Sequence, residues 1–235
     1  MEQQSVRLLP RWLWLWFPIL LAGFLLGLIL FSPQHVKLLI NREGGLVELA
    51  TPLMLVPAVC YGVLAVGHIR VLPARWLGVW ILLVTLASFY FAGEEVSWGQ
   101  QIFHWETPES IGALNDQNET NLHNMSSWFD QKPRILLELW VLIGGVFVPL
   151  LYRLKSIRLQ SSDWRYWFWP HFVCLPTAAL AIIVKLPERY RDLGGVLPYT
   201  SGFRYSEVQE LYFAVFLMLY LVATYRKLLQ LPVNR

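Results

Sequence analysis

Long apolar runs separated by short polar segments make up most of this chain. A run of about 20 mostly apolar residues is long enough for a helix that crosses a lipid bilayer. Six runs approach this length, at residues 12–31, 46–66, 76–93, 135–152, 166–184 and 211–225. The first follows Arg7 and Arg11 without a small-residue cleavage site after it, so we expect an uncleaved span. The pattern predicts an all-α integral membrane bundle of six transmembrane helices in a single domain, residues 1–235.

Composition supports the same class of protein. Of the 235 residues, 56% are hydrophobic, 15% are charged and 12 are Trp, which leaves too little polar surface for a water-soluble globule of this size. The formal net charge of +3 is small, and we predict no nucleic-acid partner. Cys60 and Cys174 lie inside apolar runs, which predicts packing residues rather than a disulfide framework.

The basic residues are distributed unequally between the two sides of the predicted bundle. Six spans put both termini on one side, and Lys and Arg favour the cytoplasmic side. The segments on the side of the termini hold Arg7, Arg11, Arg70, Arg75, Arg153, Lys155, Arg158, Arg165, Arg226, Lys227 and Arg235 against only Glu2 and Asp163. We therefore predict cytoplasmic termini, in a bacterial inner membrane. An aromatic belt is expected at the same interface, formed by Trp12, Trp14, Trp16, Trp76, Trp164, Trp167 and Trp169.

Acidic residues gather on the opposite, outer side. Four different spans bring carboxylates there: Glu48, Glu94, Glu95, Glu138, Glu207 and Glu210. A carboxylate in or beside hydrocarbon is costly and by default indicates a functional site. Glu138, Glu207 and Glu210 can also be read as ordinary boundary residues that reach toward water. We expect Glu48, Glu94 and Glu95 to face one another at the outer end of the bundle.

The third apolar run leads directly into a dense set of polar residues. If its helix continues past the membrane edge, a turn of about 100° per residue places five side chains along one stripe. These are Glu94, Ser97, Trp98, Gln101 and either His104 or Trp105, with Glu95 on the neighbouring face. Trp98 can also be read as a plain interfacial anchor.

The longest segment between spans, residues 99–133, is expected to cap the same face. Thr107-Pro108-Glu109 is typical of a helix start, with a capping Thr and a Pro in the first turn. It predicts a short interfacial helix in the outer loop between the third and fourth transmembrane helices. The polar residues 115–124 follow it, and a loop of this length in a compact protein is usually functional or disordered.

Three motifs in this region carry a resemblance to known proteins. They are Gly93-Glu-Glu-Val-Ser-Trp-Gly-Gln100, Glu106-Thr-Pro108 and Asn121-Leu-His-Asn124, joined by an acidic stretch, Gly45-Leu-Val-Glu48. Together they resemble a pattern in uncharacterised bacterial polytopic membrane proteins, which implies a membrane location but no activity. A looser similarity is to alkaline-ceramidase-like membrane hydrolases, which join Ser, Asp and His around zinc. Their paired histidines on a late helix are absent here.

The predicted site combines carboxylates with an imidazole. Two carboxylates in a setting of low dielectric divide the roles of acid and base, and a nearby His titrates near neutrality. We therefore predict Glu94, Glu95 and His123 as catalytic residues. A divalent metal would find its ligands in Glu48, Glu94 and His123. Substrate contacts are expected from Ser97, Trp98, Gln101, Glu119, Asn121 and Asn124.

Three classes of function fit this pattern. The first is a membrane-embedded hydrolase or transferase of lipid metabolism, whose lipid or polyprenyl-linked substrate reaches the site from the outer leaflet. The second is an ion-coupled transporter, for which carboxylates near the bilayer midplane and discontinuous helices are expected. The third is a non-catalytic accessory subunit of an envelope-lipid or glycan assembly system. The sequence does not determine the substrate or the oligomeric state.

Overall fold

The computed structural model describes residues 9–32, 35–36, 45–103, 105–108, 127–196 and 203–231. Within these ranges the chain forms helices and no strand. Six helical stretches are long and apolar enough to cross a membrane. The protein is therefore an all-α integral membrane bundle, and the predicted fold class is confirmed.

The six spans follow the predicted runs closely, although several are built from more than one element. The first span is η1 (Trp12–Trp16) with α1 (Phe17–Phe31), the second is α3 (Leu46–Val66) and the third is α4 (Arg75–Glu95). The fourth joins α7 (Ser127–Trp140), η5 (Val141–Phe147) and α8 (Val148–Leu154). The fifth joins α9 (Trp164–Phe168), η6 (Phe172–Cys174), α10 (Leu175–Ile183) and α11 (Leu186–Asp192), and the sixth is α12 (Tyr205–Leu228). Short helices η2 (Ile69–Val71), η3 (Ser97–Gly99) and α5 (Gln100–Phe103) lie in the connections. The predicted interfacial helix beginning at Thr107 falls almost entirely outside the described residues.

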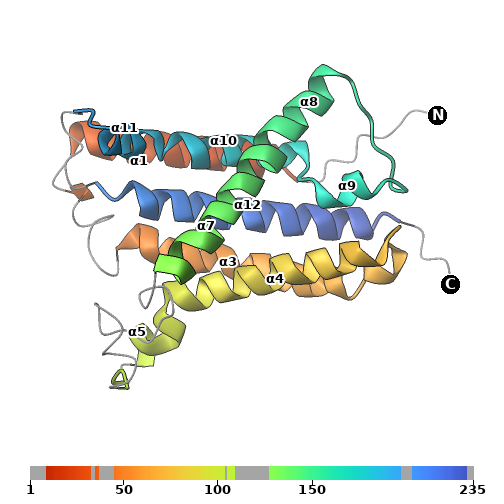
Figure 1. Cartoon of the computed structure of the whole chain (residues 1–235), viewed down its shortest axis with the longest axis horizontal. Helices are drawn as coiled ribbons and strands as arrows, with labels where there is room; N and C mark the ends of the chain where they lie inside the picture. Colours follow the sequence, from red (N-terminus) through yellow and green to blue (C-terminus); the bar gives the residue numbers. More distant parts are fainter. Residues whose placement is uncertain are drawn as a thin grey trace.

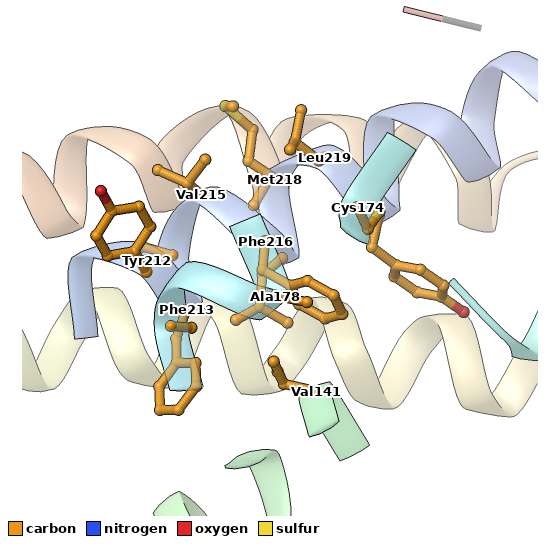
Figure 2. Packing of buried hydrophobic residues seen from close by; sticks show 14 of the residues in the cluster. Val141, Cys174, Ala178, Tyr212, Phe213, Val215, Phe216, Met218 and Leu219 are labelled. Carbon is orange, nitrogen blue, oxygen red and sulfur yellow. The ribbon is translucent and has the colours of Figure 1, made fainter. Parts of the chain in front are cut away.

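Helix α12 is the centre of the bundle. Its most apolar stretch is 89% buried inside the protein, against 11% for the first span. A helix that is apolar all round must find neighbours on every side, and α12 lies between the α1–α10 pair and the α3–α4 pair (Figure 1). Side chains leave it in different directions: Val215 and Met218 on one side, Phe213 on another, and Phe216 beside Ala178 and Val141 (Figure 2).

The fifth span is broken at Pro170. Trp169 is extended, with φ −80° and ψ 139°, as expected for a residue that precedes proline. In a membrane the freed backbone carbonyls need donors from the protein itself. Helix α12 supplies them, because Lys227 Nζ donates to the Tyr166 carbonyl over 2.7 Å and the Tyr220 hydroxyl donates to the Trp167 carbonyl over 3.1 Å.

Aromatic rings gather at this end of the bundle, which we call the aromatic end. Trp76 at the start of α4 lies 5.6 Å from the Trp164 ring and 5.7 Å from Phe168. The predicted aromatic belt is wrong for Trp167, which is 1% exposed. Its indole N–H donates to the Ser161 carbonyl, so Trp167 belongs to the core rather than to the lipid interface.

Candidate functional site at the carboxylate end

At the opposite end of the bundle, helix α4 stops at Glu95 instead of continuing. After Val96, the residues Ser97, Trp98 and Gly99 have φ values of 47°, 55° and 101°. The left-handed region is unfavourable for residues with a side chain, and such strain persists mainly where the surroundings enforce it, often at functional sites. The predicted helical stripe through Ser97, Trp98 and Gln101 is therefore wrong, since the chain turns sharply after α4.

The turn folds Trp98 back onto the last turns of α4. Its indole N–H donates to Glu94 Oε1 over 2.6 Å, and its ring lies edge-on to Phe89 and Tyr90 at 5.9 and 6.0 Å. Glu94 is buried and also interacts with Tyr90. The Glu94 carboxylate thus holds Trp98 in place. This is a structural role, separate from the catalytic role that the sequence predicts for Glu94.

Gly93 makes room for this arrangement. A Cβ at this position would lie 2.8 Å from two ring carbons of Trp98. We predict that Gly93→Ala displaces the Trp98 ring and lowers the free energy of unfolding by about 1–3 kcal/mol, the usual cost of overpacking. Chemical unfolding in mixed micelles measures the change.

A second helical glycine provides the matched control. Gly23 lies in α1, and an added Cβ there would meet no atom within 4 Å. Gly23→Ala should therefore leave stability unchanged or raise it by up to about 1 kcal/mol, because Ala favours a helix over Gly. Equal effects of Gly23→Ala and Gly93→Ala would contradict the role given to Gly93.

The chain beyond the turn begins a small aromatic cap. Gln100 Nε2 donates to the Trp105 carbonyl over 3.1 Å and to the Thr107 hydroxyl over 2.8 Å. The rings of Phe103 and Trp105 stack at 6.1 Å, with 11° between their planes. Both rings are exposed, so this end of the bundle presents flat apolar surface beside the carboxylates.

Glu95 lies within electrostatic range of charged residues on other helices. It is half-buried, and the charged groups acting on it are Glu210, Glu207, Glu48 and Arg134. These come from α12, α3 and α7, so four helices contribute to one group. We call Glu48, Glu95, Glu207 and Glu210 the carboxylate cluster and this end of the bundle the carboxylate end.

Arg134 of α7 binds the part of the carboxylate cluster that lies on α12. Its guanidinium lies 2.8 Å from Glu210 Oε1 and donates to Gln209 Oε1 and the Ser206 carbonyl over 3.2 and 3.3 Å. Gln209 is fully buried and donates in turn to the Ala181 carbonyl of α10 over 3.1 Å. Arg134 thereby connects α7, α12 and α10 at the depth of the carboxylates.

Further ion pairs surround the cluster. Arg204 lies 2.7 Å from Glu207 across one turn of α12. Glu138 of α7 pairs with Arg189 of α11. The alternative reading of Glu138, Glu207 and Glu210 as ordinary water-facing residues is therefore wrong, because their side chains are 15%, 11% and 13% exposed and each pairs with an Arg.

The structure brings some of the predicted site residues together. Glu48 and Glu95 belong to one cluster, while Glu94 contacts Trp98 and Tyr90. The prediction that Glu94 faces Glu48 and Glu95 stays a prediction. Ser97 is fully buried in the strained turn. The Gln101 side chain is not described, and four predicted residues lie outside the described ranges: Glu119, Asn121, His123 and Asn124.

Sequence reasoning missed Glu207, Glu210 and Arg134 as site residues. The signal for the two glutamates was their shared depth with Glu48 and Glu95. No apolar pattern could show that Arg134 turns inward, because an Arg at the end of a span usually reaches toward water or lipid head groups.

A metal site is not formed by the residues that the structure describes. No group of three or more His, Cys, Asp or Glu side chains within them is arranged to hold a metal ion. The predicted ligand set of Glu48, Glu94 and His123 remains a prediction, since His123 lies outside these residues.

No protein-family model, curated protein or solved structure matches the chain. The function must therefore be argued from the site itself.

Proposed function

We propose that the protein is a membrane-embedded hydrolase or transferase that acts on a lipid or polyprenyl-linked substrate. The observation that carries this proposal is the carboxylate cluster, which draws Glu48, Glu95, Glu207 and Glu210 from three helices and Arg134 from a fourth. Several carboxylates that act on one another at one site can divide the roles of acid and base between them.

Glu95 is the residue we assign to proton transfer. As a base it would take the proton from water or from an acceptor hydroxyl, while a protonated neighbour in the cluster would give a proton to the leaving group. Arg134 would keep the Glu210 carboxylate in place.

An amphipathic substrate fits the position of the cluster. The carboxylates lie at the end of apolar helices, so a head group at their depth would leave its tail in hydrocarbon. The exposed rings of Trp98, Phe103 and Trp105 beside them are the kind of side chains that favour the membrane interface. We infer that the head group enters from this side.

An ion-coupled transporter is the second candidate, favoured by the broken fifth span. Transporters commonly place their ion sites at such breaks. Here the break at Pro170 is held by Tyr220 and Lys227 of α12, at the aromatic end, while the carboxylates lie at the other. This separation supports the enzyme more than the transporter. The third candidate is an accessory subunit that would use the same end to bind a partner.

The composition of the membrane lipids tests whether the protein is an enzyme. Quantitative mass spectrometry should compare membranes of cells that contain or lack the protein. An enzyme predicts the accumulation of one lipid or lipid-linked species and the loss of its product when the protein is absent. Unchanged lipid chemistry would contradict the enzyme and leave the transporter and the accessory subunit.

We also propose that the carboxylate end faces outward from a bacterial inner membrane, with both termini in the cytoplasm. The excess of Lys and Arg at the aromatic end supports this orientation. Single cysteines at the exposed positions 106 and 155, introduced as Glu106→Cys and Lys155→Cys in a Cys60→Ser background, test it. An impermeant thiol reagent should label position 106 in intact spheroplasts and position 155 only after lysis. The reverse pattern would move the site to the cytoplasmic side.

A further inference from the structure

The loop between α8 and α9 displays cations that no carboxylate neutralises. Arg153, Lys155 and Arg158 are all exposed, and within the described part of the chain none of them forms an ion pair. At the carboxylate end, by contrast, Arg134, Lys185, Arg189 and Arg204 are each paired with a Glu. The Arg153 guanidinium lies over the Phe172 ring at 4.9 Å, so the loop is a positive surface with an aromatic neighbour but no carboxylate partner in these residues.

The start of the loop is a built turn rather than a frayed helix end. Ser156 has a φ of 51°, the Ile157 N–H donates to the Tyr152 carbonyl over 2.8 Å, and the Ser156 N–H donates to the Arg153 carbonyl over 3.2 Å. This pair of hydrogen bonds is a Schellman helix stop. The turn fixes the backbone that carries Arg153 and Lys155.

The acidic residue at the far end of the loop already forms an ion pair and hydrogen bonds with a neighbouring Arg. Asp163 caps α9 through the Arg165 N–H over 2.9 Å, and the Arg165 guanidinium binds both of its carboxylate oxygens. Side-chain and backbone hydrogen bonds from Arg165 hold the pKa of Asp163 below its ordinary value. Asp163 is thus ionised at neutral pH and paired locally, so it leaves the three cations available.

Apolar side chains alternate with these cations. Leu154 is 83% exposed and Ile157 is 39% exposed, and the loop directly follows a membrane span at the edge of the bundle (Figure 1). Trp164, also exposed, begins the next helix. Such a surface places aliphatic groups toward acyl chains and cations toward head-group phosphates.

We propose that the α8–α9 loop binds anionic phospholipid through Arg153, Lys155 and Arg158. Phosphate oxygens of the head group would accept hydrogen bonds from these cations, and Leu154 and Ile157 would enter the acyl region. Each Lys or Arg close to an anionic membrane surface adds to binding. This surface lies at the aromatic end, so the inference is independent of the proposed chemistry at the carboxylate end.

The test measures phospholipid binding by the purified full chain in nanodiscs or detergent, with phosphatidylglycerol as the anionic probe and phosphatidylcholine as the neutral one. The wild type should retain phosphatidylglycerol preferentially in native mass spectrometry. The double change Lys155→Gln and Arg158→Gln should lower that preference about 10- to 30-fold, since two charges near the surface are lost. The charge-conserving change Lys155→Arg with Arg158→Lys should keep it.

Two exposed cations on the α3–α4 connection, Arg70 and Arg75, form the matched control. Neither forms an ion pair within the described residues, and changing both to Gln removes the same charge from the same end of the bundle. This variant should keep at least most of the preference, because these two cations lie outside the turn that places Arg153 and Lys155 beside Leu154 and Ile157. An equal loss in both double variants, an absence of preference in the wild type, or displacement by inorganic phosphate alone would overturn the proposal. Thermal unfolding with phosphatidylcholine shows that each variant is folded.

Discussion

Replacing Glu95 with Gln is expected to reduce function by about 100-fold or more while the protein remains folded. The change keeps the size of the side chain but removes its ability to transfer a proton, and general acid/base catalysis is typically worth about 10²–10⁴-fold. Glu95 is the member of the carboxylate cluster on which Glu48, Glu207, Glu210 and Arg134 all act. Complementation of a strain that lacks the protein, together with its membrane lipid profile, measures the loss.

The adjacent residue supplies the control for this experiment. Glu94 accepts a hydrogen bond from Trp98, and the amide oxygen of Gln can accept the same bond. Glu94→Gln should therefore keep most of the function and cost little stability. Equal losses of function for Glu94→Gln and Glu95→Gln would contradict the different roles that their contacts assign to them. Full function of Glu95→Gln would remove Glu95 from the mechanism.

Replacing Arg134 with Gln is expected to lower the free energy of unfolding by about 2–4 kcal/mol. The change leaves Glu210 without the cation that lies 2.8 Å away. Removing one partner of a largely buried ion pair leaves a buried charge whose desolvation nothing offsets. It also weakens the hydrogen bonds that join α7 to Gln209 and Ser206. Chemical unfolding in mixed micelles measures the loss.

Two further variants separate this effect from a general loss of charge. Glu210→Gln added to Arg134→Gln should recover part of the stability, because the double variant no longer buries an unpaired carboxylate. Arg165→Gln breaks the ion pair with Asp163, in which the two side chains are 47% and 22% exposed, and should cost far less stability than Arg134→Gln. If Arg165→Gln and Arg134→Gln destabilise the protein equally, Arg134 has no special place in the cluster.

The sequence predicted the number, type and approximate ends of the helices because bilayer thickness dictates the length of an apolar run. The first two spans begin and end where the pattern placed them. The sixth begins at Tyr205, six residues before the predicted start at 211. Its first turns carry Glu207, Gln209 and Glu210, which interrupt the apolar pattern but find partners inside the bundle.

The site was less predictable because it depends on contacts between helices. Helical periodicity could not show that the chain turns back at Ser97 and Trp98, since that turn uses left-handed backbone conformations that side chains normally avoid. It also could not separate the roles of Glu94 and Glu95. Those roles follow from the partners that α3, α7 and α12 bring to the end of α4.

Lipid turnover by the purified protein tests the central claim most directly. The full chain, reconstituted in nanodiscs with a native membrane lipid extract, should consume one lipid or lipid-linked species over time and form its product. The Glu94→Gln variant should do the same, and the Glu95→Gln variant should form no product above background. If the wild type changes no lipid species, or if Glu95→Gln turns over lipid as fast as the wild type, the carboxylate cluster is not a catalytic site.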